Sequence, residues 1–297
     1  YGRSNNDVKA GFVKQVSGFT TDLDKLSQQL FNLTTNGGDE YCGQVIYTSL
    51  KDLNWDSDPA NYKVIFIAGN EDFLQGRLHY MKACDEAKQK GVIVNTIYCG
   101  DRMQGIREHW NLNAECGSGS YTNINQDAKI EDIPTPYDST IFALNNELNG
   151  TYMYFGAYGE SAYAAQSDVD KKNYAMNKSV AAKRIEVKGK KSLYKNATWD
   201  MVDAAEKDKD FVAKVDIKTL PDSLQKKSRK EIQQVIDKKT AERTRIQKDI
   251  ETISEKRGAY IANEKKKAAS ANKSATLESE VEKIIKKQAV KYKMVIE

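Results

Sequence analysis

The stretch that decides the fold is Tyr62-Lys63-Val64-Ile65-Phe66-Ile67-Ala68-Gly69. Its apolar residues are continuous rather than alternating, and the run has the length of one strand, which is typical of a central parallel strand covered on both faces. A helix is predicted from about Gln75 to Lys90 and ends at Gly91, and the β-branched run 92–98 follows it. The sequence therefore predicts a β-α-β unit.

More helices and strands are predicted on either side of this unit. The segment 14–19 has the pattern of a short edge strand, and two amphipathic helices follow, one capped by Thr21 and one after Asn36-Gly37-Gly38-Asp39. Later in the chain, a helix over 103–112 precedes a further strand over 117–124. Because helices and strands alternate, we predict an α/β head with a partial, Rossmann-like parallel sheet and helices on both faces.

The chain divides into three predicted parts. The α/β head covers residues 1–130, an all-α accessory region that packs on the head covers 131–220, and a charged helical tail covers 221–297. The accessory region is expected to hold helices up to Asn149, over 160–185 and over 194–206. Its many tyrosines suit either an interface or internal packing.

The tail carries a heptad pattern that basic residues interrupt. Lys239, Arg243 and Arg257 occupy seam positions between isoleucines, so a dimeric coiled coil would bury cations, and an intramolecular pairing is favoured. A polar gap over 265–274 precedes a last amphipathic helix. We therefore predict an antiparallel helical hairpin, with self-association through the tail left open.

Composition limits the classes of partner. The net charge is +4 with acidic and basic residues intermixed, so the sequence does not favour nucleic-acid or anionic-membrane binding. No apolar run has the length of a membrane span. The glycine-rich stretches match neither a Walker loop nor a dinucleotide fingerprint. The sequence starts at Tyr1 without a leader, which predicts a processed chain or a fragment of a longer one.

The four cysteines do not have the spacing of a zinc site. Cys42, Cys84, Cys99 and Cys116 form no CxxC pair, and the two histidines, His79 and His109, are far from them in sequence. Cys42 and Cys99 are both predicted at one edge of the sheet. They are either a disulfide of an oxidising compartment or two buried free thiols.

The head resembles a bacterial von Willebrand factor A domain. The resemblance rests on Gly37-Gly38-Asp39-Glu40, on the strand ending Ile67-Ala68-Gly69-Asn70-Glu71, and on Asn95-Thr96-Ile97-Tyr98-Cys99-Gly100 before Trp110, within roughly residues 1–130. The segments 148–152, 195–203 and the charged helices after Pro221 are similar to a region that accompanies this domain in some bacterial proteins.

The resemblance implies a metal-ion-dependent adhesion site at the carboxyl edge of the sheet, where open α/β sheets also bind ligands on general grounds. The family's first metal motif, Asp-x-Ser-x-Ser, is absent and is expected upstream of Tyr1. Asp39, Glu40, Asn70 and Glu71 are the candidate oxygen ligands for Mg²⁺ or another divalent cation. The competing interpretation is that Asp39 and Glu40 only cap the helix that follows them.

The sequence thus favours a non-enzymatic adhesion or scaffold protein that binds a protein ligand and is exported to the periplasm or the cell surface. One alternative is a metal-dependent hydrolase that uses Asp39, Glu71 and His109, which requires these side chains to converge on one water or metal. Arg102 and Glu108 lie near the same edge, but no nucleophile accompanies them. A second alternative is a structural coiled-coil protein.

Overall fold

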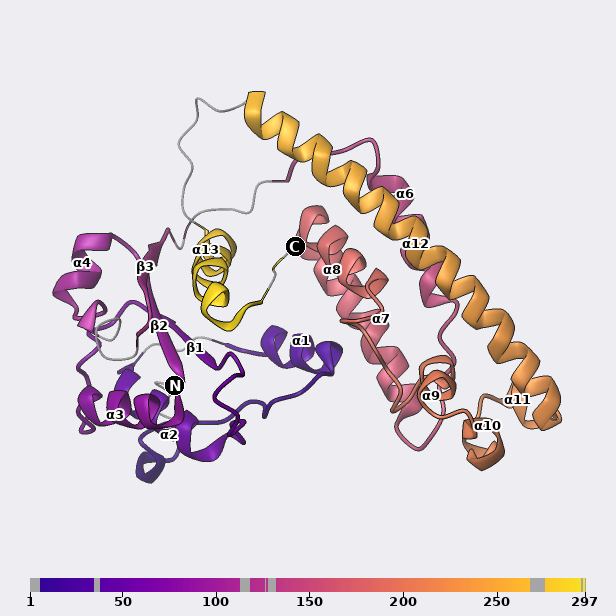
Figure 1. The fold of residues 1–297 in the computed structure, drawn as a ribbon, viewed down its shortest axis with the longest axis horizontal. Coiled ribbons are helices and arrows are strands. Elements are labelled where there is room, and N and C mark those ends of the chain that lie inside the picture. The colour runs from indigo at the N-terminus through magenta and orange to yellow at the C-terminus, as the bar shows by residue number, and fades with distance from the viewer. Residues whose placement is uncertain are drawn as a thin grey trace. The chain divides into compact units, whose positions relative to one another are not determined.

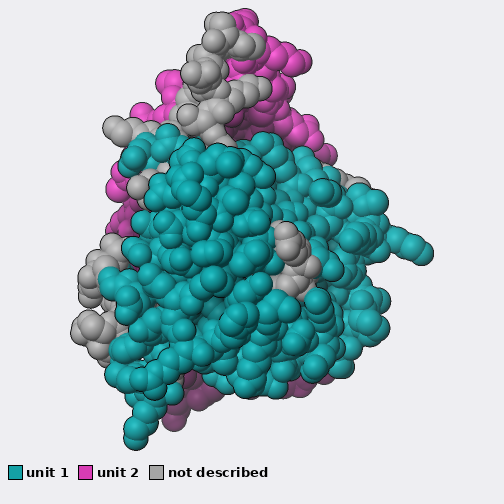
Figure 2. Space-filling model, turned by 90° about the vertical axis from the view of Figure 1, so that its left-hand side faces the viewer, with its two compact units in different colours: residues 1–19, 34–130, 272–297 teal, residues 20–33, 131–271 magenta. Residues whose placement is uncertain are grey.

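The computed structural model describes residues 6–34, 38–112, 118–125, 127, 132–267, 276–294 and 296. The chain forms two compact units (Figure 2). Unit 1 comprises residues 1–19, 34–130 and 272–297, and unit 2 comprises residues 20–33 and 131–271. The parts of our predictions that concern Asn36, Gly37, Cys116, Gly117 and residues 268–274 lie outside the described residues.

Unit 1 is built around a parallel sheet with the strand order β1-β2-β3 (Figure 1). Val64 pairs with Ile93 in the first ladder, and Thr96 pairs with Tyr121 in the second. The described elements of unit 1 are η1 (Val8–Ala10), α2 (Cys42–Asp52), β1 (Val64–Gly69), α3 (Tyr80–Lys90), β2 (Ile93–Cys99), α4 (Arg102–Arg107), β3 (Tyr121–Ile124), α13 (Leu277–Ala289) and η3 (Val290–Tyr292). The mixed α/β class predicted from the sequence is confirmed.

Helices lie on both faces of this sheet. Successive side chains of a strand point to opposite faces. Val94 and Tyr98 of β2 share a buried core with α2 and α3 on one face. Between them, Asn95 hydrogen-bonds to Gln288 of α13 on the other face. Every residue of β2 from Ile93 to Tyr98 is buried as a result, which explains why each of these positions except Asn95 is apolar or β-branched.

Some boundaries and elements differ from the sequence predictions. The segment 14–19 forms no strand, and the helix predicted from Gln75 begins at Tyr80, where the His79 side chain accepts a hydrogen bond from a backbone N–H of the first turn. The helix predicted over 160–185 is two helices. Asn177 separates them, because its side chain caps the second by accepting hydrogen bonds from two backbone N–H groups.

Unit 2 is helical in its described part. Helix α12 has 39 residues, and its buried isoleucines pack against α6, α8 and α9. The described elements of unit 2 are α1 (Leu23–Phe31), α6 (Asp138–Asn149), α7 (Gly159–Met176), α8 (Lys178–Gly189), α9 (Met201–Lys207), α10 (Phe211–Lys214), η2 (Ile217–Thr219), α11 (Asp222–Gln225) and α12 (Arg229–Lys267). None of the helices in the described part of the chain is long and apolar enough to cross a membrane.

The predicted helical hairpin is not what the structure shows. Helix α12 packs within unit 2, whereas α13 contacts β3 in unit 1. The sequence pattern favoured an intramolecular pairing of this helix with the last helix, whereas α12 packs against α6, α8 and α9. The residues 221–297 therefore do not form one tail.

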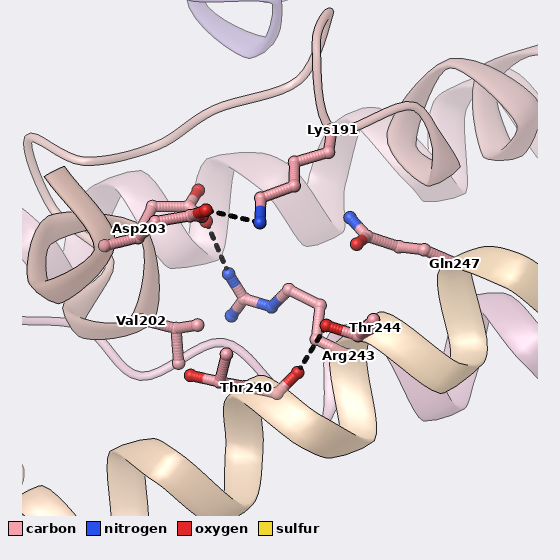
Figure 3. A pocket seen from close by; sticks show the side chains of 8 residues that line it. Lys191, Val202, Asp203, Thr240, Arg243, Thr244 and Gln247 are labelled. Atoms are coloured by element: carbon pink, nitrogen blue, oxygen red, sulfur yellow. Dashed lines mark hydrogen bonds and ion pairs between the residues drawn. The ribbon is translucent and has the colours of Figure 1, made fainter.

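The seam cations of α12 are neutralised inside unit 2. Arg243 donates to the carboxylates of Asp200 at 2.7 Å and Asp203 at 2.8 Å, and its guanidinium lies 4.0 Å from the ring centre of Tyr152. Figure 3 shows Arg243 pointing toward Asp203 from α12. The hollow beside them holds about 10 Å³, the space of about one water molecule. This cluster therefore has a structural role.

Candidate functional site at the carboxyl edge of the sheet

Three loops meet at the carboxyl edge of the sheet in unit 1. Asn70, Glu71 and Asp72 follow β1, Asp101 follows β2 and caps α4, and Glu40 lies just before α2. Because β1 and β2 are parallel, their carboxyl ends share one edge. The predicted location of the site is thus the place where these loops converge.

Glu40 lies at the centre of this convergence. The backbone N–H groups of Asn70 and Glu71 lie close enough to its carboxylate to lower its pKa. Its own backbone N–H donates to Gln75 Oε1 at 2.7 Å, and Gln75 Nε2 lies 3.4 Å from Glu71 Oε2. The structure therefore brings together three of the four predicted ligand residues, with Asn70 contributing a backbone donor rather than its side chain.

The Glu40 carboxylate is incompletely satisfied. Its Oε2 atom is buried and accepts no hydrogen bond in the described part of the chain. Burial raises the pKa of Glu40 above its ordinary value, and the nearby charge of Glu71 raises it further, although the backbone N–H groups of Asn70 and Glu71 oppose this. Buried carboxylate oxygens normally have donors, so this atom marks a position where a donor or a cation would be stabilised.

Asp39 takes no part in this contact. Its Oδ2 accepts a hydrogen bond from the Tyr41 hydroxyl at 3.1 Å in an exposed position. Neither Asp39 nor Glu40 caps α2, because the N-cap residue is Tyr41 and no side chain bonds there. The capping interpretation of these two residues is therefore wrong.

The described residues do not supply a full set of metal ligands. No group of three or more histidine, cysteine, aspartate or glutamate side chains is placed to hold a metal ion within the described ranges. Mg²⁺ requires about six oxygen ligands. Glu40 and Glu71 would supply only part of such a set.

His109 pairs with Asp72 rather than with the residues of the hydrolase alternative. His109 Nδ1 lies 3.1 Å from Asp72 Oδ1, and the His109 backbone has a φ of 64°, in the left-handed region that non-glycine residues rarely adopt. Trp110 Nε1 donates to the Glu71 carbonyl at 2.8 Å, and this ring is fully buried. These contacts join the loop after β1 to the segment after α4.

The two cysteines near this edge are free thiols. Cys42 is buried, and burial raises its pKa to about 12. Burial also raises the pKa of Cys99, whereas Cys84 is disulfide-bonded. The disulfide suggested for Cys42 and Cys99 is therefore absent. Both thiols are protonated at neutral pH and are poor nucleophiles.

Sequence reasoning missed Asp72 and Gln75. Asp72 directly follows the candidate pair Asn70 and Glu71, so its position after β1 was a usable signal. Gln75 lies beyond the turn that starts at Asp72, and no periodic pattern marks it. Comparisons with known proteins add no further residue, since no family model, no curated protein and no solved structure matches this chain.

Proposed function

We propose that this chain is a non-enzymatic, von Willebrand factor A-type binding protein, of the adhesion or scaffold kind, whose protein ligand contacts the carboxyl edge of the sheet. The parallel strand order, the helices on both faces and the convergence of loops at this edge support the proposal. Such edges are the usual ligand positions of open α/β sheets.

The observation that carries the proposal is the buried Oε2 atom of Glu40, which accepts no hydrogen bond from the residues that the structure describes. An unsatisfied buried carboxylate oxygen is unfavourable by roughly 1 to 3 kcal/mol or more. A lysine or arginine of the protein ligand supplies the missing donor, and Glu71 beside it adds a second negative charge. A divalent cation shared with the ligand is the other arrangement that this chemistry allows.

An oxidising location fits the proposal. Disulfides persist mainly in exported proteins and are rare in the cytosol, and Cys84 is disulfide-bonded. The proposal therefore includes export to the periplasm or the cell surface. The hydrolase alternative receives less support, because Asp39, Glu71 and His109 form no metal-holding group among the described residues.

Site-specific photo-crosslinking tests the proposal. Leu74 is 41% exposed and lies in the loop after β1, next to Gln75, so a benzophenone side chain at this position should crosslink the ligand in cells that make the full chain. The crosslinked band should disappear in the additional variant Glu40→Gln. Chelation with EDTA separates the two arrangements, since only a shared cation makes the band sensitive to it.

Two controls make the result decisive. The same photo-reactive side chain at Asn61, which is exposed at the amino end of β1, should give no such band. Asp39→Asn changes an exposed neighbouring carboxylate and should leave the band in place. A band at position 74 that persists in Glu40→Gln, or no band at all, would contradict the proposal.

A further inference from the structure

Unit 2 contains a pocket of about 470 Å³ between three of its helices, a size suited to a small molecule. The pocket is independent of the sheet edge described above. The lining residues that matter here are Phe142 of α6, Ser167, Asp170, Lys171 and Tyr174 of α7, and Arg184 of α8.

The floor of the pocket is a rigid polar network centred on Asp170. Its carboxylate accepts hydrogen bonds from Lys188 Nζ at 2.7 Å, Asn149 Nδ2 at 2.8 Å, Asn145 Nδ2 at 3.0 Å and Arg184 Nε at 2.5 Å. Lys188 Nζ also donates to both amide oxygens, at 2.9 Å and 2.6 Å. These side chains are held in place before any ligand arrives.

The charges around the floor leave one cation in excess. Asp24 accepts a hydrogen bond from Arg184 Nη2 at 2.7 Å, so Asp24 and Asp170 balance Arg184 and Lys188. Lys171 adds a third positive charge, and it has no ion-pair partner in the described ranges of the chain. The pocket is therefore suited to one negative charge.

Arg184 also has donors left for a ligand. Its Nε and Nη2 atoms bond to Asp170, Asp24 and the Gln166 carbonyl. No acceptor among the described residues takes the Nη1 hydrogens of this guanidinium, whose side chain is 11% exposed. A carboxylate in the pocket would take these donors and lie near Lys171.

The wall beside these cations is aromatic. The rings of Phe142 and Tyr174 pack edge to face with centroids 5.2 Å apart, and Tyr174 is 51% exposed. Aromatic rings arranged in this way offer apolar surface to a second flat group. We propose that this pocket binds a small monocarboxylate that carries a planar, apolar ring, with Arg184 and Lys171 binding the carboxylate and the aromatic wall binding the ring.

Ligand-observed NMR on the full chain tests this inference. The probe is 3-phenylpropionate, and its uncharged amide, 3-phenylpropionamide, is the matched control. Saturation transfer is expected for the carboxylate and a several-fold weaker effect for the amide. Glucose tests the neutral-sugar alternative, which predicts transfer to glucose instead.

Two variants locate the binding without disturbing the buried network. Lys171→Gln removes the excess charge and should weaken binding of 3-phenylpropionate about fivefold, as for an exposed ion pair. Ser167→Phe fills the pocket and should abolish binding, and circular dichroism verifies that this variant is folded. Equal affinity for the acid and the amide, no transfer to the acid, or unchanged affinity in both variants would overturn the inference.

Discussion

The side-chain amides of Gln288 in α13 and Asn95 in β2 hydrogen-bond to each other inside unit 1, although 193 positions separate them in the sequence. Asn95 Nδ2 donates to Gln288 Oε1 at 3.2 Å, and Gln288 Nε2 donates to Asn95 Oδ1 at 2.8 Å. Tyr62 also donates to Gln288 Oε1, at 2.7 Å. Both amides are buried, so α13 is part of the interior of this unit rather than an appendage.

We expect Gln288→Ala to destabilise unit 1. The substitution leaves Asn95 Nδ2 buried without its acceptor, although Asn95 Oδ1 keeps the Ser120 N–H, and this loss costs roughly 1 to 3 kcal/mol. Hydrogen exchange of the β2 amides reports this change, because opening of unit 1 exposes them. The neighbouring Lys287 is exposed, and Lys287→Ala should leave exchange unchanged. Equal protection of β2 in the two variants would show that α13 does not stabilise the sheet.

We expect Arg243→Ala to destabilise unit 2 strongly. Asp200 is fully buried and Asp203 is largely buried, and loss of the guanidinium leaves both carboxylates without their cation. Breaking such a buried pair costs about 3 to 5 kcal/mol. Arg245→Ala is the matched control on the same helix, since its ion pairs are exposed, and it should cost at most about 1 kcal/mol. Urea unfolding measures the stability loss of each variant. The signal is Trp199 fluorescence, in a chain that lacks Trp55 and Trp110.

Acid should weaken unit 2 through Asp170. Burial alone raises its pKa, but the charges of Lys188 and Arg184 outweigh this and hold the pKa at about 2, below the ordinary 3.8. A lowered folded-state pKa gives stability that is complete above about pH 4 to 5 and is lost as pH falls toward 2, here about 2 kcal/mol. The free energy of unfolding of unit 2 at pH 6 and pH 2.5, followed by Trp199 fluorescence, measures this loss. In Asp170→Asn, the loss of unfolding free energy between pH 6 and pH 2.5 should be smaller by this amount.

Glu40 should show the opposite dependence on pH. Its pKa is raised in the folded chain, so the folded state binds its proton more tightly, and the cost of ionising Glu40 grows as pH rises above its ordinary value of 4.5. Glu40→Gln should therefore be more stable than the parent chain at pH 7, with a smaller difference at pH 4. Thermal unfolding without any ligand measures this. A Glu40→Gln variant that is less stable at pH 7 would mean that donors in the folded chain outweigh the cost of burying the Glu40 carboxylate.

The sequence predicted the strands that local pattern defines and missed what depends on distant partners. β1 is a continuous apolar run and β2 is rich in β-branched residues, so both were found within two residues of their observed bounds. The segment 14–19 has a strand-like pattern but finds no strand to pair with, and pairing is a non-local property. The last helix was predicted from its periodicity. Its contact with Asn95 was not predicted, because a single polar residue such as Gln288 does not reveal from the sequence that it is buried.

The position of the candidate site was predictable from the strand pattern, whereas one of its side-chain pairings was not. The convergence of Glu40, Asn70 and Glu71 follows from the parallel order of β1 and β2, which the apolar runs indicated. The pairing of Asp72 with His109 depends on the conformation of the segment after α4, where His109 has a positive φ. Such a backbone conformation is set by the surrounding structure and not by the residue type.

The contact of α13 with β2 also sets the order of events during protein synthesis. Asn95 Nδ2 has its side-chain acceptor only after residue 288 has been synthesised, whereas the described elements of unit 2 end at Lys267. Translation from Asn95 to Gln288, which are 193 positions apart, takes roughly 10 to 40 seconds at typical elongation rates. Unit 1 is thus complete only after α13 has been synthesised, and until then the α13 face of its sheet lacks its helix.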